Sequence, residues 1–344
     1  MVAKLNKNDP WIKAKDEQPE VMRSINRTAA RITLNGRRHY TTPLECGPVP
    51  SVTTIISETA SEANKRKLEM WSKNNPGVKE QAAERGTAIH YGMEQYLKGN
   101  KTPDIKDEYM DFWSGMPPIL DQFQEILWAE SPILEKFDFT IGADDVARVW
   151  GCDDQGRGWA GAPDIIAVAN GKLTLADLKT SVKPYSRKWP KDLEKGSPEW
   201  RDLLGGHMKF KKTLKQLAAY DIAIEQTLGM RVQQAAILVS TPVRTQVFKI
   251  SRRFLDSLRD DWYKLVAEYY TQVEEGGVHD PDLIGWSMRW NPSDKKTRQK
   301  MVAWSVATET CVQTKEDPVL IYNKILERNK RKDKDCKESI GETN

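Results

Sequence analysis

The clearest pattern of apolar and polar positions lies on either side of an Asn-Gly pair near the middle of the chain. Apolar residues dominate the segment 164–169, and Asn170 with Gly171 forms the dipeptide most typical of a two-residue hairpin turn. The following segment, 172–179, alternates with a period of two, so Asp177 would share one strand face with the leucines before it. The sequence therefore predicts a β-hairpin at this point.

Apolar residues spaced three and four positions apart predict helices elsewhere in the chain. The expected helices cover residues 61–70, 77–98, 104–125, 214–228 and 253–273. Alternating or β-branched segments predict strands over 125–134, 137–141, 232–240 and 246–250, and a short hairpin over 31–40. The segment 49–57 fits a strand or a helix, with Ser51 as a suitable N-cap, and the Gly- and Asp-rich segment 151–161 is typical of a loop. This order of elements predicts an α/β fold, with a mixed central β-sheet flanked by helices and helical additions at both ends.

Composition is that of a soluble globular protein. The chain has 344 residues, of which 39% are hydrophobic and 30% are charged. No apolar run is long enough to span a membrane, and the first twenty residues lack the apolar core of a signal peptide, so we expect a cytoplasmic protein without a membrane partner. The cysteines are isolated and form no Cys-x-x-Cys pair: Cys46, Cys152, Cys311 and Cys336. Their spacing excludes a zinc ribbon or a cysteine-ligated cluster of ordinary spacing, and a disulfide framework is not expected.

We expect three parts along the chain. Residues 1–47 form an N-terminal arm with a short hairpin, and residues 48–275 form the core. Residues 276–344 form a C-terminal extension, which ends in a disordered basic tail. Within the core, the segment 181–213 is a basic insertion that follows the predicted hairpin directly.

Two acidic residues lie at corresponding ends of the two hairpin arms. Asp164 opens the first arm, and Asp177 lies near the end of the second. The tight turn pairs the arms side by side, so the two carboxylates would lie close together beside apolar residues. Such an arrangement is costly unless a cation compensates it, and Mg²⁺ prefers hard oxygen ligands of this kind. The sequence therefore predicts a divalent-metal site here.

The chain after the hairpin is strongly basic. Residues 180–215 contain ten lysines and arginines but only four acids, a surplus of 10 − 4 = +6. Aromatic residues are interleaved with these cations, which is typical of a surface that follows a phosphate backbone and stacks on bases. The candidate DNA-binding residues in this stretch are Lys183, Arg187, Lys188, Lys209, Lys211 and Lys212. The alternative is a solvated insertion whose aromatic residues only anchor it.

Other candidate residues are ambiguous on their own. His90 lies at the edge of a helical apolar face, where a lone histidine is more often structural than functional. Glu130 lies among apolar neighbours near a predicted strand end. It could be a functional carboxylate or, equally, an ordinary strand-end carboxylate that faces water. Gln216 and Tyr220 are four residues apart and would share one face of a helix.

Taken in order, these residues resemble a known family of nucleases. The motifs are Arg85-Gly-Thr-x-x-His90, Glu130, Gly161-x-x-Asp164, Asp177-x-Lys179 and Gln216-x-x-x-Tyr220. Their order and kind resemble the RecB-like exonuclease branch of the PD-(D/E)xK nuclease superfamily. Pro50-Ser-Val-Thr53 and Leu68-x-x-Trp71 are further similar to the mitochondrial genome maintenance exonuclease group and its phage and bacterial relatives. The resemblance covers about residues 48–250 and implies a restriction-endonuclease-like core. The insertion over 181–213 and the chain after 276 depart from it, and the absent iron–sulfur cysteines imply no cluster.

The resemblance also implies a role for each residue. Asp164 and Asp177 would hold Mg²⁺ or Mn²⁺ together with the backbone carbonyl of Leu178, and His90 would complete the metal site. Lys179 would orient the attacking water and stabilise the developing negative charge. Glu130 would bind the metal through water or orient its helix, whereas Gln216 and Tyr220 would support the site and contact the strand.

The implied activity is metal-dependent hydrolysis of DNA phosphodiester bonds by an exonuclease. The expected partner is single- or double-stranded DNA with free ends, in phage or bacterial replication, recombination or degradation; the protein would then act in the cytoplasm, or in the host cytoplasm if phage-encoded. The alternatives are a nucleic-acid-binding protein with an inactive nuclease fold, a structure-specific endonuclease and a phosphoesterase of small molecules. The sequence leaves open strand polarity, DNA against RNA, and the oligomeric state.

Overall fold

A six-stranded mixed sheet forms the centre of the molecule. The computed structural model describes residues 31–34, 37–40, 42, 48–133, 148–274, 324–325 and 327–328. The strand order is β11-β10-β9-β8-β4-β5. The strands are β4 (Phe123–Ala129), β5 (Ser131–Pro132), β8 (Ile165–Ala169), β9 (Lys172–Thr180), β10 (Gln234–Ser240) and β11 (Thr245–Ser251). Only β9 and β10 pair in parallel, and the other neighbours are antiparallel. The mixed sheet flanked by helices confirms the predicted fold class.

The predicted hairpin is formed by β8 and β9. Ile165 pairs with Ala176, which places Asp164 opposite Asp177. At the turn, Asn170 has φ 53° and Gly171 has φ 69°. Positive φ at both central residues is what a type I′ turn requires, and Asn and Gly accept it at the least cost.

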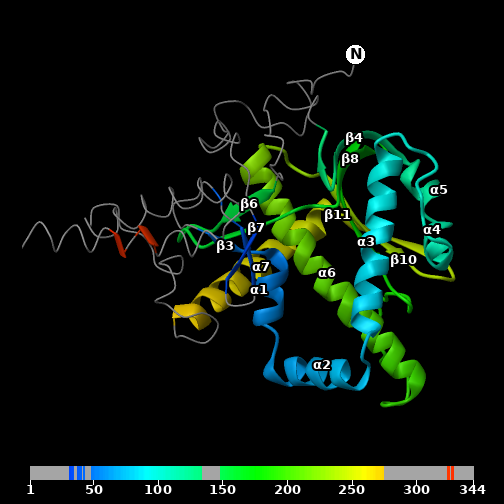
Figure 1. The fold of residues 1–344 in the computed structure, drawn as a ribbon, viewed down its shortest axis with the longest axis horizontal. Helices are drawn as coiled ribbons and strands as arrows, with labels where there is room; N and C mark the ends of the chain where they lie inside the picture. Colours follow the sequence, from blue (N-terminus) through cyan, green and yellow to red (C-terminus); the bar gives the residue numbers. More distant parts are fainter. Residues whose placement is uncertain are drawn as a thin grey trace, which may run out of the picture.

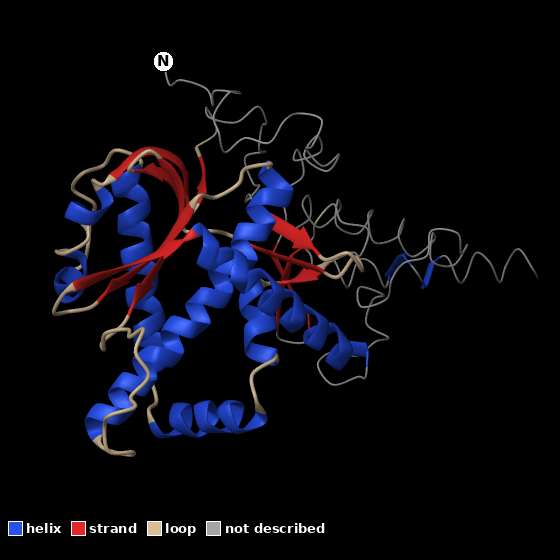
Figure 2. Ribbon diagram, turned by 180° about the vertical axis from the view of Figure 1, so that it is seen from behind, coloured by secondary structure: helices blue, strands red, loops and turns tan. Residues whose placement is uncertain are grey.

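Helices cover both faces of this sheet (Figure 1 and Figure 2). The helix α3 (Val78–Leu97) packs on one face, where it shares an apolar cluster with alternate residues of the central strands. The helices α6 (Pro198–Leu228) and α7 (Arg252–Glu274) pack on the other face, together with α1 (Val52–Glu58). Side chains of β9 therefore contact α3 and α6 in alternation, and residues at its end lie between two helical layers.

Smaller elements surround this core. The predicted hairpin over 31–40 is present as β1 (Arg31–Leu34) and β2 (Arg37–Tyr40), and β3 (Val49–Pro50) pairs with β2. The ambiguous segment 49–57 is strand and then helix, because the Ser51 hydroxyl accepts a hydrogen bond from the Thr54 amide at 3.0 Å and caps α1. The helix α2 (Glu62–Asn74) matches the prediction over 61–70 but has no buried residue.

The single helix predicted over 104–125 is wrong. The segment is broken into η3 (Asp107–Tyr109), α4 (Met110–Trp113) and α5 (Pro117–Leu120), and β4 starts at Phe123. Two features interrupt the helix. A Cβ at Gly115 would lie 2.5 Å from the Thr245 hydroxyl, so the backbone passes close to β11 there. Pro117 then lacks the amide that a continuous helix needs.

The loop predicted over 151–161 is also wrong in part. The strands β6 (Val149–Cys152) and β7 (Gly158–Gly161) pair antiparallel on either side of a tight loop. The Asp153 carboxylate closes this loop by accepting hydrogen bonds from the amides of Gln155 and Arg157, both at 2.9 Å. The strand predicted over 137–141 lies outside the described residues.

The basic insertion is partly helical. The helix α6 begins at Pro198 rather than near Leu214, and the Ser197 hydroxyl caps it by accepting from the Trp200 amide at 3.1 Å. The basic segment is therefore a loop over 181–197 followed by the first half of a 31-residue helix. Strands β10 and β11 and helix α7 match their predictions, and Phe254 in the first turn of α7 is exposed. Among the described helices, none combines the length and apolarity needed to cross a bilayer.

A buried carboxylate joins α6 to α7. Asp221 is fully buried and accepts hydrogen bonds from the guanidinium groups of Arg252, at 2.6 and 2.7 Å, and Arg259, at 2.7 Å. We expect Asp221→Asn to lower the free energy of unfolding by about 3 kcal/mol, because it removes the buried carboxylate that both guanidinium groups share, although Arg252 keeps Asp256 and Arg259 keeps Glu225. Urea denaturation measures this loss.

The exposed pair of Lys65 and Glu62, 3.0 Å apart, provides the control. Glu62→Gln should change the free energy of unfolding by less than about 0.5 kcal/mol. Equal effects of Asp221→Asn and Glu62→Gln would show that the buried charge cluster does not hold the helices together.

Candidate functional site

The candidate site lies at one end of the β8–β9 hairpin, between the two helical layers. His90 reaches it from α3, and Asp164 from the residue before β8. Glu130 follows β4, the neighbour of β8 in the sheet. The structure therefore brings together residues that are far apart in the sequence and were singled out separately.

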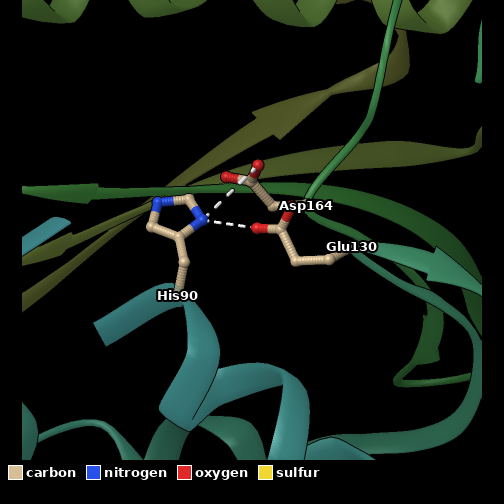
Figure 3. Close-up of side chains that lie close together, drawn as sticks. All are labelled: His90, Glu130 and Asp164. Atoms are coloured by element: carbon tan, nitrogen blue, oxygen red, sulfur yellow. Dashed lines mark hydrogen bonds and ion pairs between the residues drawn. The ribbon is translucent and has the colours of Figure 1, made fainter. Parts of the chain in front are cut away.

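Three side chains meet at the centre of the site (Figure 3). The Nδ1 atom of His90 lies 2.5 Å from Oε1 of Glu130 and 3.8 Å from Oδ1 of Asp164. One ligand atom from each residue lies within 4.8 Å of the others, a spacing that a metal ion could bridge, and Asp177 is not part of this group. The other ring nitrogen, Nε2, lies 3.1 Å from the carbonyl oxygen of Leu178.

Glu130 adopts an uncommon backbone conformation. Its φ is 55°, in the left-handed region, which costs a non-glycine residue about 1–2 kcal/mol. The Glu130 amide donates a hydrogen bond of 2.8 Å to the carbonyl oxygen of Asp164, which holds this conformation in place. This backbone conformation directs the Glu130 carboxylate to His90, and the side chain remains 28% exposed.

The two aspartates are buried and incompletely satisfied. Asp164 accepts a hydrogen bond of 2.6 Å from the Leu178 amide, and burial raises the pKa of its carboxyl despite the nearby charges of His90 and Lys179. Asp177 is 1% exposed, and within the described residues neither of its oxygens accepts a hydrogen bond. Burial raises the pKa of Asp177 to about 6.

Lys179 is the cation closest to Asp177. Its Nζ lies 2.5 Å from Oδ2 of Asp177, an ion pair without hydrogen-bonding geometry, and donates to the Leu178 carbonyl at 3.2 Å. Burial alone would lower the pKa of Lys179, but the charges of Asp177 and Asp164 outweigh it and raise the pKa. The lysine is therefore charged and held against the acidic cluster.

The donor set fits a divalent metal ion. Burial lowers the pKa of His90, but Asp164 and Glu130 outweigh this and raise it to about 9, so a protonated imidazole offsets the carboxylates when no metal is bound. Carboxylate oxygens and an imidazole are ordinary ligands of Mg²⁺ and Mn²⁺. Within the described residues the Asp177 oxygens accept no hydrogen bond and have Lys179 as their ion-pair partner, so a further cation beside this group would stabilise the carboxylate.

Gln216 and Tyr220 reach the site from α6. They are hydrogen-bonded to each other, and the pKa of the Tyr220 phenol is raised by burial and by Asp164 and Asp177. The Tyr220 ring also packs on Gly161, where a Cβ would lie 2.7 Å from Cε1. The glycine of the Gly161-x-x-Asp164 motif therefore makes room for this tyrosine.

The structure separates the basic candidates into three groups. Lys209 and Lys212 lie near the site: the Lys209 ammonium donates to the Ser181 hydroxyl at 3.0 Å, and burial and the charge of Lys179 lower the pKa of Lys212. Lys183 instead pairs with Asp202, and Arg187 donates to the Lys249 carbonyl at 2.5 Å. The remaining candidates are Lys188 and Lys211, and all six candidates are exposed.

Two of the four aromatic residues of the basic stretch are anchors. Tyr185 and Phe210 are buried and belong to the main apolar cluster, so they cannot stack on bases. Trp189 is 50% exposed and packs edge-on against His207. The alternative interpretation of this segment, in which aromatic residues hold it to the core, therefore applies to Tyr185 and Phe210.

Comparisons with known proteins identify no family. No protein-family model matches the chain, and no curated protein matches it. Among solved structures, SSO0001 is 18% identical, with a TM-score of 0.30, over 63% of this chain and 76% of that chain. A protein of Eubacterium rectale described as a "Putative exonuclease" is 13% identical, with a TM-score of 0.34, over 57% of this chain and 69% of that chain. These likenesses are too distant to assign a function.

Metal binding should be visible as a gain in stability. We expect Mn²⁺ or Mg²⁺ to raise the melting temperature, because a ligand at 100 times its dissociation constant adds about 2.7 kcal/mol to the free energy of unfolding. Asp164→Asn should remove most of this gain, as measured by differential scanning calorimetry with and without metal.

The matched control is Asp121→Asn. Asp121 is an exposed acid, bonded to the Tyr96 hydroxyl at 2.9 Å, that lies outside the candidate site. This variant should keep the full metal-dependent gain. Equal metal-dependent gains in Asp164→Asn and Asp121→Asn would contradict a metal site at Asp164.

Proposed function

We propose that this protein is a metal-dependent deoxyribonuclease that hydrolyses phosphodiester bonds, acting as an exonuclease on strands with free ends. One observation carries the proposal: the charged Lys179 and the buried Asp177 lie beside the convergent side chains of His90, Glu130 and Asp164. Cleavage of a phosphate ester needs a metal ion that activates water and a cation that stabilises the developing negative charge, and a lysine next to an acidic metal site can supply both.

The metal would be Mg²⁺ or Mn²⁺. His90, Glu130 and Asp164 would hold it, because their ligand atoms already lie within 4.8 Å of one another. Asp177 and the Leu178 carbonyl would complete its surroundings. When bound, such an ion polarises the phosphate and lowers the pKa of a coordinated water.

The protein's own side chains would do the rest of the chemistry. The Lys179 ammonium, fixed by Asp177 and the Leu178 carbonyl, would orient the attacking water and stabilise the negative charge that develops on the phosphate. Tyr220 remains protonated because its pKa is raised, so its hydroxyl would donate to a phosphate oxygen while Gln216 holds it in place. Both residues would thereby position the strand.

The substrate would be held by the basic side of α6. Lys209 and Lys212 lie near the acidic cluster, Lys211 is exposed on the same helix, and Lys188 is exposed on the loop before it. Lysines in such positions bind the phosphate backbone by charge, without reading its sequence. A small-molecule substrate would not need this extended surface. The proposed setting is the cytoplasm of a bacterium, or of a phage-infected host, in replication, recombination or DNA degradation.

A decayed nuclease that only binds DNA is the main competing function. It is less favoured because Asp164, Asp177 and Lys179 are all present and face one another. An endonuclease would use the same chemistry, so the form of the substrate has to separate the two.

Cleavage of end-labelled linear and closed circular DNA, single- and double-stranded, tests the proposal. We expect linear DNA to be degraded with Mg²⁺ or Mn²⁺ but not with EDTA, and circles to stay intact. Lys179→Gln should lower the rate by about 10²–10³-fold, the usual effect of removing one group that stabilises the transition state.

Lys172→Gln is the charge-matched control, because Lys172 is an exposed lysine at the opposite end of β9. It should cleave at the rate of the unchanged protein, and calorimetry should show that both variants are folded. Cutting of circles would assign an endonuclease instead, and DNA binding without cleavage of any substrate would sink the catalytic proposal.

A further inference from the structure

A buried arginine near the candidate site has no acidic partner among the described residues. Arg85 lies on α3 and is 9% exposed, and its Nε has no hydrogen-bond partner within the described part of the chain. Its guanidinium packs on the ring of Phe112, 4.6 Å from the centroid. Burial lowers the pKa of Arg85, so its charge is held at a cost that stacking on a ring offsets only in part.

A lysine on the opposite helix is fixed at the end of β9. The Lys209 ammonium donates to the Ser181 hydroxyl at 3.0 Å, and this hydroxyl donates in turn to the Lys183 carbonyl at 2.7 Å. The Ser181 amide donates to the Ser240 carbonyl at 2.9 Å, which continues the pairing of β9 with β10. Among the described residues no carboxylate pairs with Lys209. Ser181 therefore positions a cation rather than neutralising it.

The two cations flank the same strand end. A Cβ at Gly86, the residue after Arg85, would lie 3.7 Å from the Thr180 hydroxyl, so α3 passes against the end of β9 there. Lys209 contacts the next residue of the chain, Ser181. Desolvation and the positive charges of Arg85 and Lys183 lower the pKa of Lys209. Lys183 has Asp202 as its partner, whereas neither Arg85 nor Lys209 pairs with a carboxylate of the described residues. Two neighbouring positive charges of this kind are the usual surroundings of a bound anion.

We propose that Arg85 and Lys209 form an anion subsite that binds a phosphate group next to the one that is cut. Ser181 lies two residues beyond Lys179 and its amide continues the pairing with β10, so at about 3.4 Å per residue the subsite lies about 6.8 Å further along the chain. The inference rests on the proposed nuclease function for what supplies the phosphate. Arginine binds phosphate through its planar fork and lysine as a point charge, so the two together suit this ligand.

Two positions in a nucleic acid carry the required chemistry. One is the internal phosphodiester that neighbours the scissile bond. The other is the terminal phosphomonoester of a strand, which would fix the distance between the strand end and the bond that is cut. Either phosphate would place at least two non-bridging oxygens between Arg85 and Lys209.

Binding of labelled single-stranded oligonucleotides in EDTA tests the subsite without any cleavage. The oligonucleotides carry a 5′-phosphate, a 3′-phosphate or hydroxyl groups at both ends. We expect Lys209→Gln to weaken binding about tenfold or more, and to reduce the slope of log affinity against log salt by about 0.7, the value for one phosphate contact of a single strand. Lys209→Arg should retain most of the affinity. Arg85→Gln should act in the same direction as Lys209→Gln.

Lys172→Gln is again the control, because it removes one positive charge at the far end of β9. A loss in Lys209→Gln that is equal for all three oligonucleotides assigns the internal phosphodiester. A loss confined to one phosphorylated end assigns the terminal phosphate. Lys209→Gln binding like Lys172→Gln, in a folded protein, overturns the subsite.

The outcome is independent of the cleavage assay. If the unchanged protein fails to cut DNA but Lys209→Gln weakens binding, the nuclease proposal falls and the anion subsite stands. If the protein cuts DNA and Lys209→Gln binds the oligonucleotides with unchanged affinity, the nuclease proposal stands and the anion subsite falls.

Discussion

The cost of burying Asp164 and Asp177 side by side is the constraint on which this site depends. Each carboxylate is nearly inaccessible to water, and hydrogen bonds satisfy Asp164 only in part and Asp177 not at all within the described residues. In the metal-free protein, the protonated His90 and the charged Lys179 offset this cost. A divalent cation would offset it more fully, which is the physical basis for a metal centre here.

The surrounding fold maintains this costly arrangement. The type I′ turn sets the register that places the two aspartates opposite each other, and the amide of Leu178 binds Asp164 across the hairpin. The left-handed backbone of Glu130 adds strain at the same place, and strain of this kind persists where the surrounding structure over-determines it. The ion cluster around Asp221 ties α6 to α7, and so fixes the helix that carries Tyr220 and Lys209.

Much of the site could be predicted because its signals are local. Asn170-Gly171 specifies the turn, the alternation in β9 specifies its faces, and the apolar stripe of α3 places His90 at its edge. Features that depend on distant contacts could not be read in this way. The direction of the Glu130 side chain depends on a backbone bond to Asp164, and the start of α6 depends on the Ser197 cap in a segment that looked like a charged loop.

Arg85 is a further feature whose surroundings depend on distant contacts. Its position in the motif before His90 was evident, but its lack of an acidic partner among the described residues depends on how α3 packs against β9 and Phe112. The interruption of the helix predicted over 104–125 likewise depends on Gly115 meeting Thr245 of β11. In both cases the sequence shows the residue, and only the tertiary structure shows what surrounds it.

The most direct test of the central claim is to locate the metal. Crystals grown with Mn²⁺ would be measured at the manganese absorption edge, so that the anomalous signal marks the ion. The account predicts a peak in coordination contact with His90, Glu130 and Asp164, and the loss of that peak in Asp164→Asn. A fully ordered site with no manganese at these residues, or with manganese bound only elsewhere, would contradict it.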